Sequence, residues 1–229
     1  MAEPALRAPG PVALLGEAAW TRELVRLPLR AHGLRGVRRG SGRPVVVISG
    51  LGGPEASTRP LRTFLRRVGH DARRSGLAVV GPDVEAQLER LGERVTALAA
   101  TQDDRVALVG WSIGGVIARE VARDHHDAVR RVVTFGTPTE GGPAHTTFSR
   151  AYGTAELERI AEAAEERAIR PISVPLTAIR SRRDGIVAPD ACIDHRTPDA
   201  ENLVVGSTHI GMGLDPDVWR IVAERLARP

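Results

Sequence analysis

The sequence contains no lysine and a single cysteine, Cys192. One cysteine cannot form a disulfide within the chain, and the absence of lysine excludes a Walker A phosphate-binding loop, which requires one. The chain also lacks any apolar run approaching the ~20 residues of a membrane-spanning helix. Its N-terminus shows no secretory signal, which would combine a basic region, an apolar core and a small-residue cleavage site. We therefore expect a cytoplasmic protein with no transmembrane segment.

Aromatic residues are also scarce, at 3% of the chain, so the core must consist mainly of aliphatic side chains. Hydrophobic residues make up 42% and charged residues 26%, which is typical of a globular protein rather than a disordered one. A length of 229 residues suits one domain, and we predict a single domain over residues 1–229.

All 32 basic residues are arginine, and the formal net charge is +4. A nucleic-acid-binding protein usually concentrates basic residues on one face. Here they are scattered, with some density between Arg22 and Arg43. We favour a solvated arginine-rich surface and predict no nucleic-acid partner; the alternative is an anionic partner or a membrane surface.

Short aliphatic segments alternate with helical patterns through most of the chain. The helical spacing of apolar residues predicts helices near residues 61–68, 84–98, 113–121 and 216–226, the second capped by Asp83 and the last by Asp215. Strands are predicted at residues 44–48, 77–80, 106–109, 131–135, 175–179 and 203–205. This alternation is typical of an α/β fold with a mostly parallel sheet covered by helices on both faces. Ligands of such folds bind at the carboxyl ends of the strands.

Residues 139–170 interrupt the alternation. They contain a Gly/Pro-rich stretch, followed by a Glu/Ala-rich segment at residues 155–168 that should be helical. Their position after a strand end suits a lid inserted over a pocket. Residues 1–43 form an N-terminal extension, which we expect to pack on the core or near the pocket. The apolar residues that indicate this packing are Leu24, Leu27 and Leu34.

The sharpest motif is a G-x-S-x-G pattern formed by Gly110, Ser112 and Gly114, between a predicted strand and a predicted helix. The serine of such a tight turn has a strained backbone, and the flanking glycines relieve crowding around it. The following helix directs free N–H groups toward developing negative charge. The pattern predicts Ser112 as a nucleophile; the alternative is a Gly-Ser turn whose serine caps a helix.

A serine nucleophile needs a general base and a group that orients the base. His209 lies between the last predicted strand and the last predicted helix, which favours it as the base. Asp184 follows the strand predicted at residues 175–179 and is the expected orienting acid. It could instead pair with a neighbouring arginine, Arg182 or Arg183. The rival acids are Asp190, Asp194 and Asp199.

Acyl transfer also requires N–H donors for the oxyanion. The expected donors are the backbone of Ile113, directly after the nucleophile, and that of Leu51, in the glycine-rich loop after the first predicted strand. The same loop does not complete a dinucleotide motif, because Glu55 stands where the third glycine is needed.

Metal-like spacings are present but incomplete. Cys192 lies three residues before His195, and His125 is adjacent to His126, yet neither pair has enough partners for a four-ligand site. We therefore predict no metal and no cofactor.

Together these segments resemble bacterial α/β-hydrolases of the lipase/esterase type, over roughly residues 44–228. The matching segments are residues 49–53, 110–115, 135–138, 181–187 and 207–212. Many relatives carry His-Gly where this chain has Ser49 and Gly50. The resemblance implies an α/β-hydrolase fold and hydrolysis of carboxylic esters through an acyl-enzyme. By position, Ser112 corresponds to the nucleophile, His209 to the base and Asp184 to the orienting acid, with Leu51 and Ile113 as oxyanion donors.

The resemblance therefore predicts a small-molecule acyl ester as the substrate. Two alternatives stay open. One is a thioesterase or acyltransferase acting on carrier-bound acyl groups, with an acidic acyl-carrier protein as partner. The other is a non-catalytic binding module on the same fold.

Overall fold

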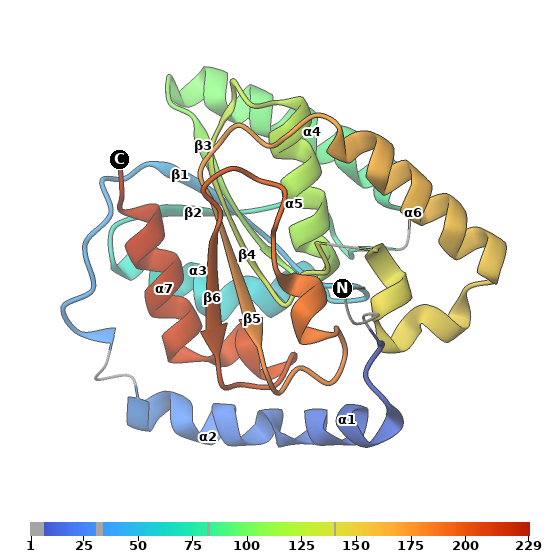
Figure 1. The fold of residues 1–229 in the computed structure, drawn as a ribbon. Coiled ribbons are helices and arrows are strands. Elements are labelled where there is room, and N and C mark those ends of the chain that lie inside the picture. Colours follow the sequence, from blue (N-terminus) through green and yellow to red (C-terminus); the bar gives the residue numbers. More distant parts are fainter. Residues whose placement is uncertain (1–6, 31–33, 82, 140) are drawn as a thin grey trace.

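The computed structural model describes residues 7–30, 34–81, 83–139 and 141–229. Among these residues, six strands form one sheet in which every neighbouring pair is parallel, in the order β2-β1-β3-β4-β5-β6 (Figure 1). The strands are β1 (Pro44–Ile48), β2 (Asp71–Arg74), β3 (Val106–Trp111), β4 (Val129–Phe135), β5 (Leu176–Ser181) and β6 (Glu201–Val205). The α/β class predicted from the alternating pattern is confirmed.

Helices cover both faces of the sheet (Figure 1). The α-helices are α1 (Pro11–Gly16), α2 (Trp20–Arg30), α3 (Arg59–Arg67), α4 (Val84–Gln102), α5 (Ile113–Asp124), α6 (Thr154–Ala168) and α7 (Pro216–Leu226). As predicted, Asp83 accepts a hydrogen bond from the Ala86 N–H at the start of α4, and Asp215 caps α7 in the same way.

The core consists of two aliphatic layers, one on each face of the sheet. Alternation along β1 supplies both, because Val46 and Ile48 face one layer while Val45 and Val47 face the other. The first layer is closed by α4 and α5, and the second by α3 and α7. Strands that are buried on both faces are usually rich in aliphatic residues, as β1 is.

The strand predicted at residues 77–80 is wrong. Val79 and Val80 form only isolated bridges with the loop after β1, and the edge strand of the sheet is β2, at residues 71–74. The sequence Asp-Ala-Arg-Arg of β2 carries no apolar pattern, because only Ala72 is buried. Charged side chains are common on edge strands, where they discourage pairing with other chains. Pro82, which follows the wrongly predicted strand, lies outside the described residues.

The N-terminal segment crosses the edge of the sheet where β5 and β6 end (Figure 1). It consists of α1, the short 3-10 helix η1 (Glu17–Ala19) and α2. Leu27 and Leu34 pack against the second core layer, whereas Leu24 is half exposed. Residues 1–6 and 31–33 of the predicted extension lie outside the described residues.

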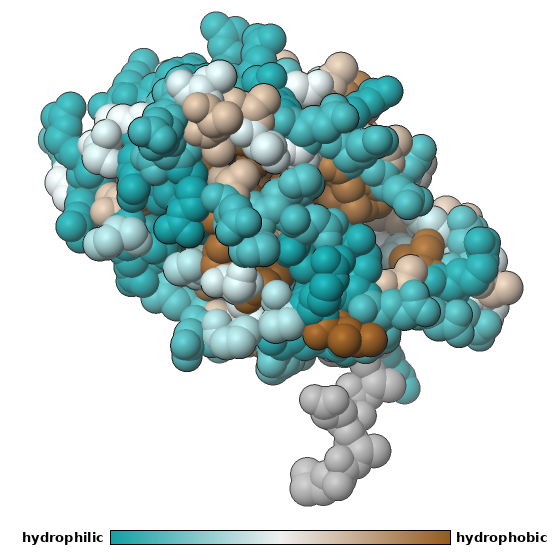
Figure 2. Space-filling view, turned by 90° about the horizontal axis from the view of Figure 1, so that it is seen from above, coloured by the Kyte–Doolittle hydropathy of each residue, from teal (hydrophilic) through white to brown (hydrophobic). Residues whose placement is uncertain are grey.

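Residues 139–170, the predicted lid, form two 3-10 helices, η4 (Gly142–His145) and η5 (Thr147–Ala151), followed by α6. The C-terminal part of α6 is tied to α5, because Arg167 pairs with Glu120 and Asp124. Glu140 lies outside the described residues. The surface seen from above, opposite α1 and α2, is mainly hydrophilic with separate hydrophobic areas (Figure 2).

Candidate active site

Ser112 lies between the last residue of β3 and the first residue of α5, in a strained conformation. Its φ of 55° and ψ of −127° are rare for a residue with a side chain and cost about 1–3 kcal/mol. The backbone on both sides is fixed. The Ser112 N–H donates to the Phe135 carbonyl at 2.9 Å, and the Thr137 hydroxyl donates to the Ser112 carbonyl at 2.9 Å. Thr137 therefore braces the turn, a role that the sequence pattern did not reveal.

The glycines around Ser112 are required by close backbone contacts. A Cβ on Gly110 would lie 2.3 Å from the Gly115 Cα, and one on Gly114 would lie 2.2 Å from the Ser49 carbonyl oxygen. A Cβ on Gly115 would lie 2.0 Å from the Thr137 hydroxyl oxygen. Any side chain at these positions would push apart β1, β4 and the start of α5.

The loop after β1 lies against Ser112. A Cβ on Gly50 would lie 3.3 Å from the Ser112 Cβ. The loop is anchored by Ser49, which is buried and donates its hydroxyl to the Gly53 carbonyl at 3.0 Å. Ser49 thus stabilises the loop that follows β1 and lies against Ser112.

Leu51 and Ile113, the predicted oxyanion donors, lie on the two segments that meet at Ser112. Ile113 is the first residue of α5, so its N–H has no partner within the helix. Leu51 is 38% exposed, and its neighbour Gly52 is held by an N–H bond to the Val80 carbonyl at 2.8 Å.

Asp184 and His209 are in direct contact. Nδ1 of His209 lies 2.7 Å from Oδ2 of Asp184, and both side chains are buried. The other carboxylate oxygen, Oδ1, accepts the N–H groups of Ile186 at 2.9 Å and Val187 at 2.7 Å. An ionised carboxylate can only accept hydrogen bonds, so Nδ1 is the donor in this contact, and in the neutral tautomer that makes it the ring proton is on Nδ1. Nε2 is then left as an acceptor.

His209 and Ser112 are linked through their neighbours. The rings of Trp111 and His209 have centroids 6.1 Å apart. Phe135 accepts the Ser112 N–H, and the next residue, Gly136, lies beside the imidazole. A Cβ on Gly136 would lie 2.9 Å from Nδ1 of His209. No hydrogen bond between the Ser112 hydroxyl and the imidazole is found in the described part of the chain. In enzymes this contact is often long until the substrate complex forms.

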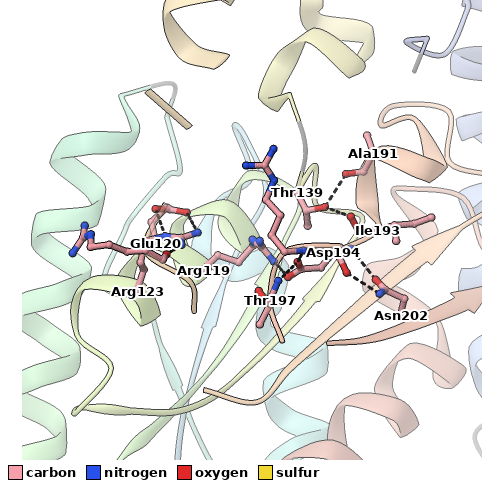
Figure 3. Close-up of polar contacts among 11 residues, drawn as sticks. Arg119, Glu120, Arg123, Thr139, Ala191, Ile193, Asp194, Thr197 and Asn202 are labelled. Atoms are coloured by element: carbon pink, nitrogen blue, oxygen red, sulfur yellow. Dashed lines mark hydrogen bonds and ion pairs between the residues drawn. The ribbon is translucent and has the colours of Figure 1, made fainter. Parts of the chain in front are cut away.

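Asp194, a rival acid, belongs to a different cluster (Figure 3). Its carboxylate pairs with the buried Arg119 of α5 and accepts the N–H groups of Arg196 and Thr197, each at 2.9 Å. Burial by itself would raise the pKa of the Asp194 carboxyl, but Arg119 and the Thr197 hydrogen bonds lower it to about 2. This acid has a structural role between α5 and the loop after β5.

Within the residues that the structure describes, the other rival acids make no hydrogen bond or ion pair with His209. Asp190 pairs with Arg180 at 2.8 Å, and its side chain is 68% exposed. Asp199 lies in a turn with a φ of 57°. Among the described residues, Asp184 makes no ion pair with Arg182 or Arg183.

Cys192 is buried close to the acid loop. Burial, together with the nearby Asp184 carboxylate, raises the pKa of its thiol well above the ordinary value. In the described ranges, no group of three or more His, Cys, Asp or Glu side chains is arranged to bind a metal ion. In the same ranges, no helix is both long and apolar enough to cross a membrane.

Glu17 is the site neighbour that the sequence did not indicate. Its carboxylate is buried and accepts N–H groups from both the loop of Asp184 and the loop of His209. Nothing in the local pattern of the N-terminal extension distinguishes this glutamate from a solvated one.

Comparison with known proteins supports the architecture. A protein-family profile described as the alpha/beta hydrolase fold matches residues 51–154. This match includes the Ser112 turn but ends before Asp184 and His209. No curated protein sequence matches the chain significantly.

Several solved structures are similar at low identity. One comes from a study of LipS and LipT, two lipolytic enzymes derived from a metagenome; its TM-score is 0.59 at 19% identity, covering 82% of this chain and 92% of that one. Lipase B of Aspergillus fumigatus gives 0.64 at 18% identity, covering 84% of this chain and 54% of the fungal one. The monoacylglycerol lipase of Paleococcus ferrophilus gives 0.60 at 17% identity, with 81% and 96% covered. The parallel sheet, the family match and these similarities together show that the chain has the α/β-hydrolase fold.

Proposed function

We propose that the protein is a serine hydrolase that cleaves carboxylic esters through an acyl-enzyme. The observation that supports this most strongly is a strained Ser112 at the N-terminus of α5 together with the buried pair of His209 and Asp184. Asp184 follows β5, and His209 follows the adjacent strand β6. Each of the three residues lies in a loop at the carboxyl edge of one parallel sheet, where ligands of such folds bind.

In this mechanism the Ser112 hydroxyl oxygen attacks the acyl carbonyl while Nε2 of His209 takes the hydroxyl proton. Asp184 accepts from Nδ1, which holds the imidazole in the required tautomer and stabilises its charged form. The N–H groups of Leu51 and Ile113 bind the tetrahedral oxyanion, each lowering the barrier by about 3–4 kcal/mol. The imidazolium then returns its proton to the departing alcohol oxygen.

Deacylation repeats these steps with water as the nucleophile. His209 takes a proton from the water as its oxygen attacks the acyl carbon of the Ser112 ester. The proton returns to the Ser112 oxygen as the carboxylic acid is released, and the free enzyme is restored. No cofactor takes part in either half of this reaction.

We assign residues 139–170 as a lid that shapes the acyl pocket. This assignment is supported by their contact with the acid loop, because the Thr147 N–H donates to the Ile186 carbonyl at 2.9 Å and Thr146 bridges to Val187. Lipolytic enzymes among the similar structures favour an acyl ester as the substrate class.

The proposal is tested with purified protein and a panel of p-nitrophenyl esters of increasing acyl length, run beside acyl-thioesters. We expect ester hydrolysis that falls by something on the order of 10⁶-fold in kcat for Ser112→Ala, with the fold unchanged. Ser41→Ala, at an exposed position away from the site, is the matched control. Full activity of Ser112→Ala would refute the assignment, and turnover of thioesters alone would move the substrate class to carrier-bound acyl groups.

A further inference from the structure

Glu17 is a buried carboxylate contributed by the N-terminal segment. It lies in η1, between α1 and α2, and is only 3% exposed. Removing an ionised carboxylate from water is strongly unfavourable unless hydrogen bonds or a countercharge replace the lost hydration. The groups that replace the lost water around Glu17 therefore indicate the role of its side chain.

Three backbone N–H groups bind the Glu17 carboxylate. Oε1 accepts from Gly185 at 2.7 Å and from His209 at 2.9 Å, while Oε2 accepts from Ile210 at 2.9 Å. Gly185 directly follows Asp184, so the donors come from the two loops that carry the acid and the histidine. Hydrogen bonds from N–H groups to an ionised carboxylate are shorter and stronger than those between neutral partners.

The N-terminal segment also packs directly against these loops. A Cβ on Gly185 would lie 2.2 Å from the Ala13 carbonyl oxygen and 3.1 Å from Oε1 of Glu17. A Cβ on Gly211 would lie 2.8 Å from Cγ of Glu23. The contacts therefore extend over the length of the segment that crosses this edge of the sheet (Figure 1).

We propose that Glu17 is a positioning residue, which fixes the separation of Asp184 and His209 by holding the backbones of both loops on one carboxylate. This inference rests on the proposed function. The side-chain contact of 2.7 Å between Asp184 and His209 joins two loops, one after β5 and one after β6. Without Glu17, three backbone N–H groups lose their acceptor, and the two loops separate or rotate.

The kinetic test compares Glu17→Ala and Glu17→Gln with the wild-type protein on a p-nitrophenyl ester. Misplacing catalytic groups by about 1 Å can reduce the rate by roughly 10²-fold. We expect a decrease of that order in kcat for Glu17→Ala, with little change in KM, because substrate contacts remain. Glu17→Gln retains one oxygen that can accept from Gly185 and His209, so it should recover most of the lost rate.

The matched control is Asp194→Asn, because Asp194 is an equally buried carboxylate that also accepts backbone N–H groups, from Arg196 and Thr197, but binds none of the N–H groups that Glu17 binds. Rates are compared after correction for the folded fraction of each variant. A wild-type kcat in folded Glu17→Ala, or an equal decrease in Asp194→Asn, would overturn the proposal.

Amide hydrogen exchange supplies a readout that does not depend on catalysis. In Glu17→Ala we expect faster exchange at Gly185, His209 and Ile210, with unchanged exchange at the amides of β3 and β4. Unchanged protection at all three amides would contradict the proposal. If the wild-type protein hydrolyses no ester, the proposed function is wrong, and the exchange experiment still decides whether Glu17 holds the two loops together.

Discussion

The two oxygens of the Asp184 carboxylate have different partners, and this difference determines what an amide at the same position would do. Oδ1 is held by the N–H groups of Ile186 and Val187, which only an oxygen can accept. In Asp184→Asn the amide nitrogen would therefore face Nδ1 of His209. Nδ1 would have to accept instead of donate, and Nε2 would carry the proton and could no longer act as a base.

Asp184→Asn should accordingly lower kcat by on the order of 10⁴-fold, as in other triads whose histidine tautomer is reversed. This decrease in kcat should be smaller than that of Ser112→Ala. The measurement is ester hydrolysis by both variants, with Asp190→Asn as the control at an exposed acid of the same segment. A harmless Asp184→Asn would contradict the role of this residue in the mechanism.

The Cys192 thiol is expected to be unreactive in the folded protein. Burial and the nearby Asp184 carboxylate raise the pKa of the thiol, and the thiolate is the reactive form. At pH 8 iodoacetamide should modify Cys192 much more slowly in the native protein than in urea. Equal rates in the two states would show that the thiol is accessible and ionised.

At the scale of elements, the packing of α5 against β4 leaves no space at Gly115. A Cβ there would meet the Thr137 hydroxyl, which braces the Ser112 turn. Gly115→Ala should destabilise the protein by about 1–3 kcal/mol and reduce the ester hydrolysis that we propose for it. Gly153→Ala, at the start of α6, is the control because nothing lies within 4 Å of the added methyl group. Urea unfolding of both variants measures the difference, and equal stabilities would contradict the close packing.

The elements that the sequence predicted well are those whose residues are buried on both faces. β1 and the first four residues of β3 are aliphatic runs, and β4 ends in Val-Val-Thr-Phe, so short β-branched and aliphatic runs indicate these strands even though β4 also contains Arg130 and Arg131. β2 escaped prediction because an edge strand can be charged, and the apolar run at residues 77–80 packs on the core without joining the sheet ladder. The sequence placed Asp184 and His209 after two predicted strands, and the structure brings their side chains into contact. Glu17 could not be predicted, since its partners are backbone groups far along the chain.

At the scale of the whole molecule, the buried pair of Arg119 and Asp194 connects α5 to the loop after β5 (Figure 3). The pKa of Asp194 is about 2 in the folded protein, below the value near 4 of an unfolded chain. Its contribution to stability is therefore fully present above pH ~4 and is lost as the pH falls toward ~2.

Asp194→Asn should lower the free energy of unfolding at pH 7 by about 3–5 kcal/mol, because it leaves Arg119 buried without a countercharge. Urea titrations of the wild type and the variant should converge as the pH falls from about 4 to about 2. A stability difference that stays constant over this pH range would show that the pKa of Asp194 does not differ between the folded and unfolded protein.

Five segments that are separate in the sequence lie at one edge of the sheet: the loop after β1, the Ser112 turn, the loop of Asp184, the loop of His209, and the N-terminal helices. In our account these segments form one serine hydrolase site, and a fluorophosphonate probe tests this directly. Mass spectrometry of the labelled wild-type protein should locate the adduct on Ser112, and His209→Ala should label far more slowly. Failure of folded wild-type protein to label, or labelling at another residue that survives Ser112→Ala, would contradict the account.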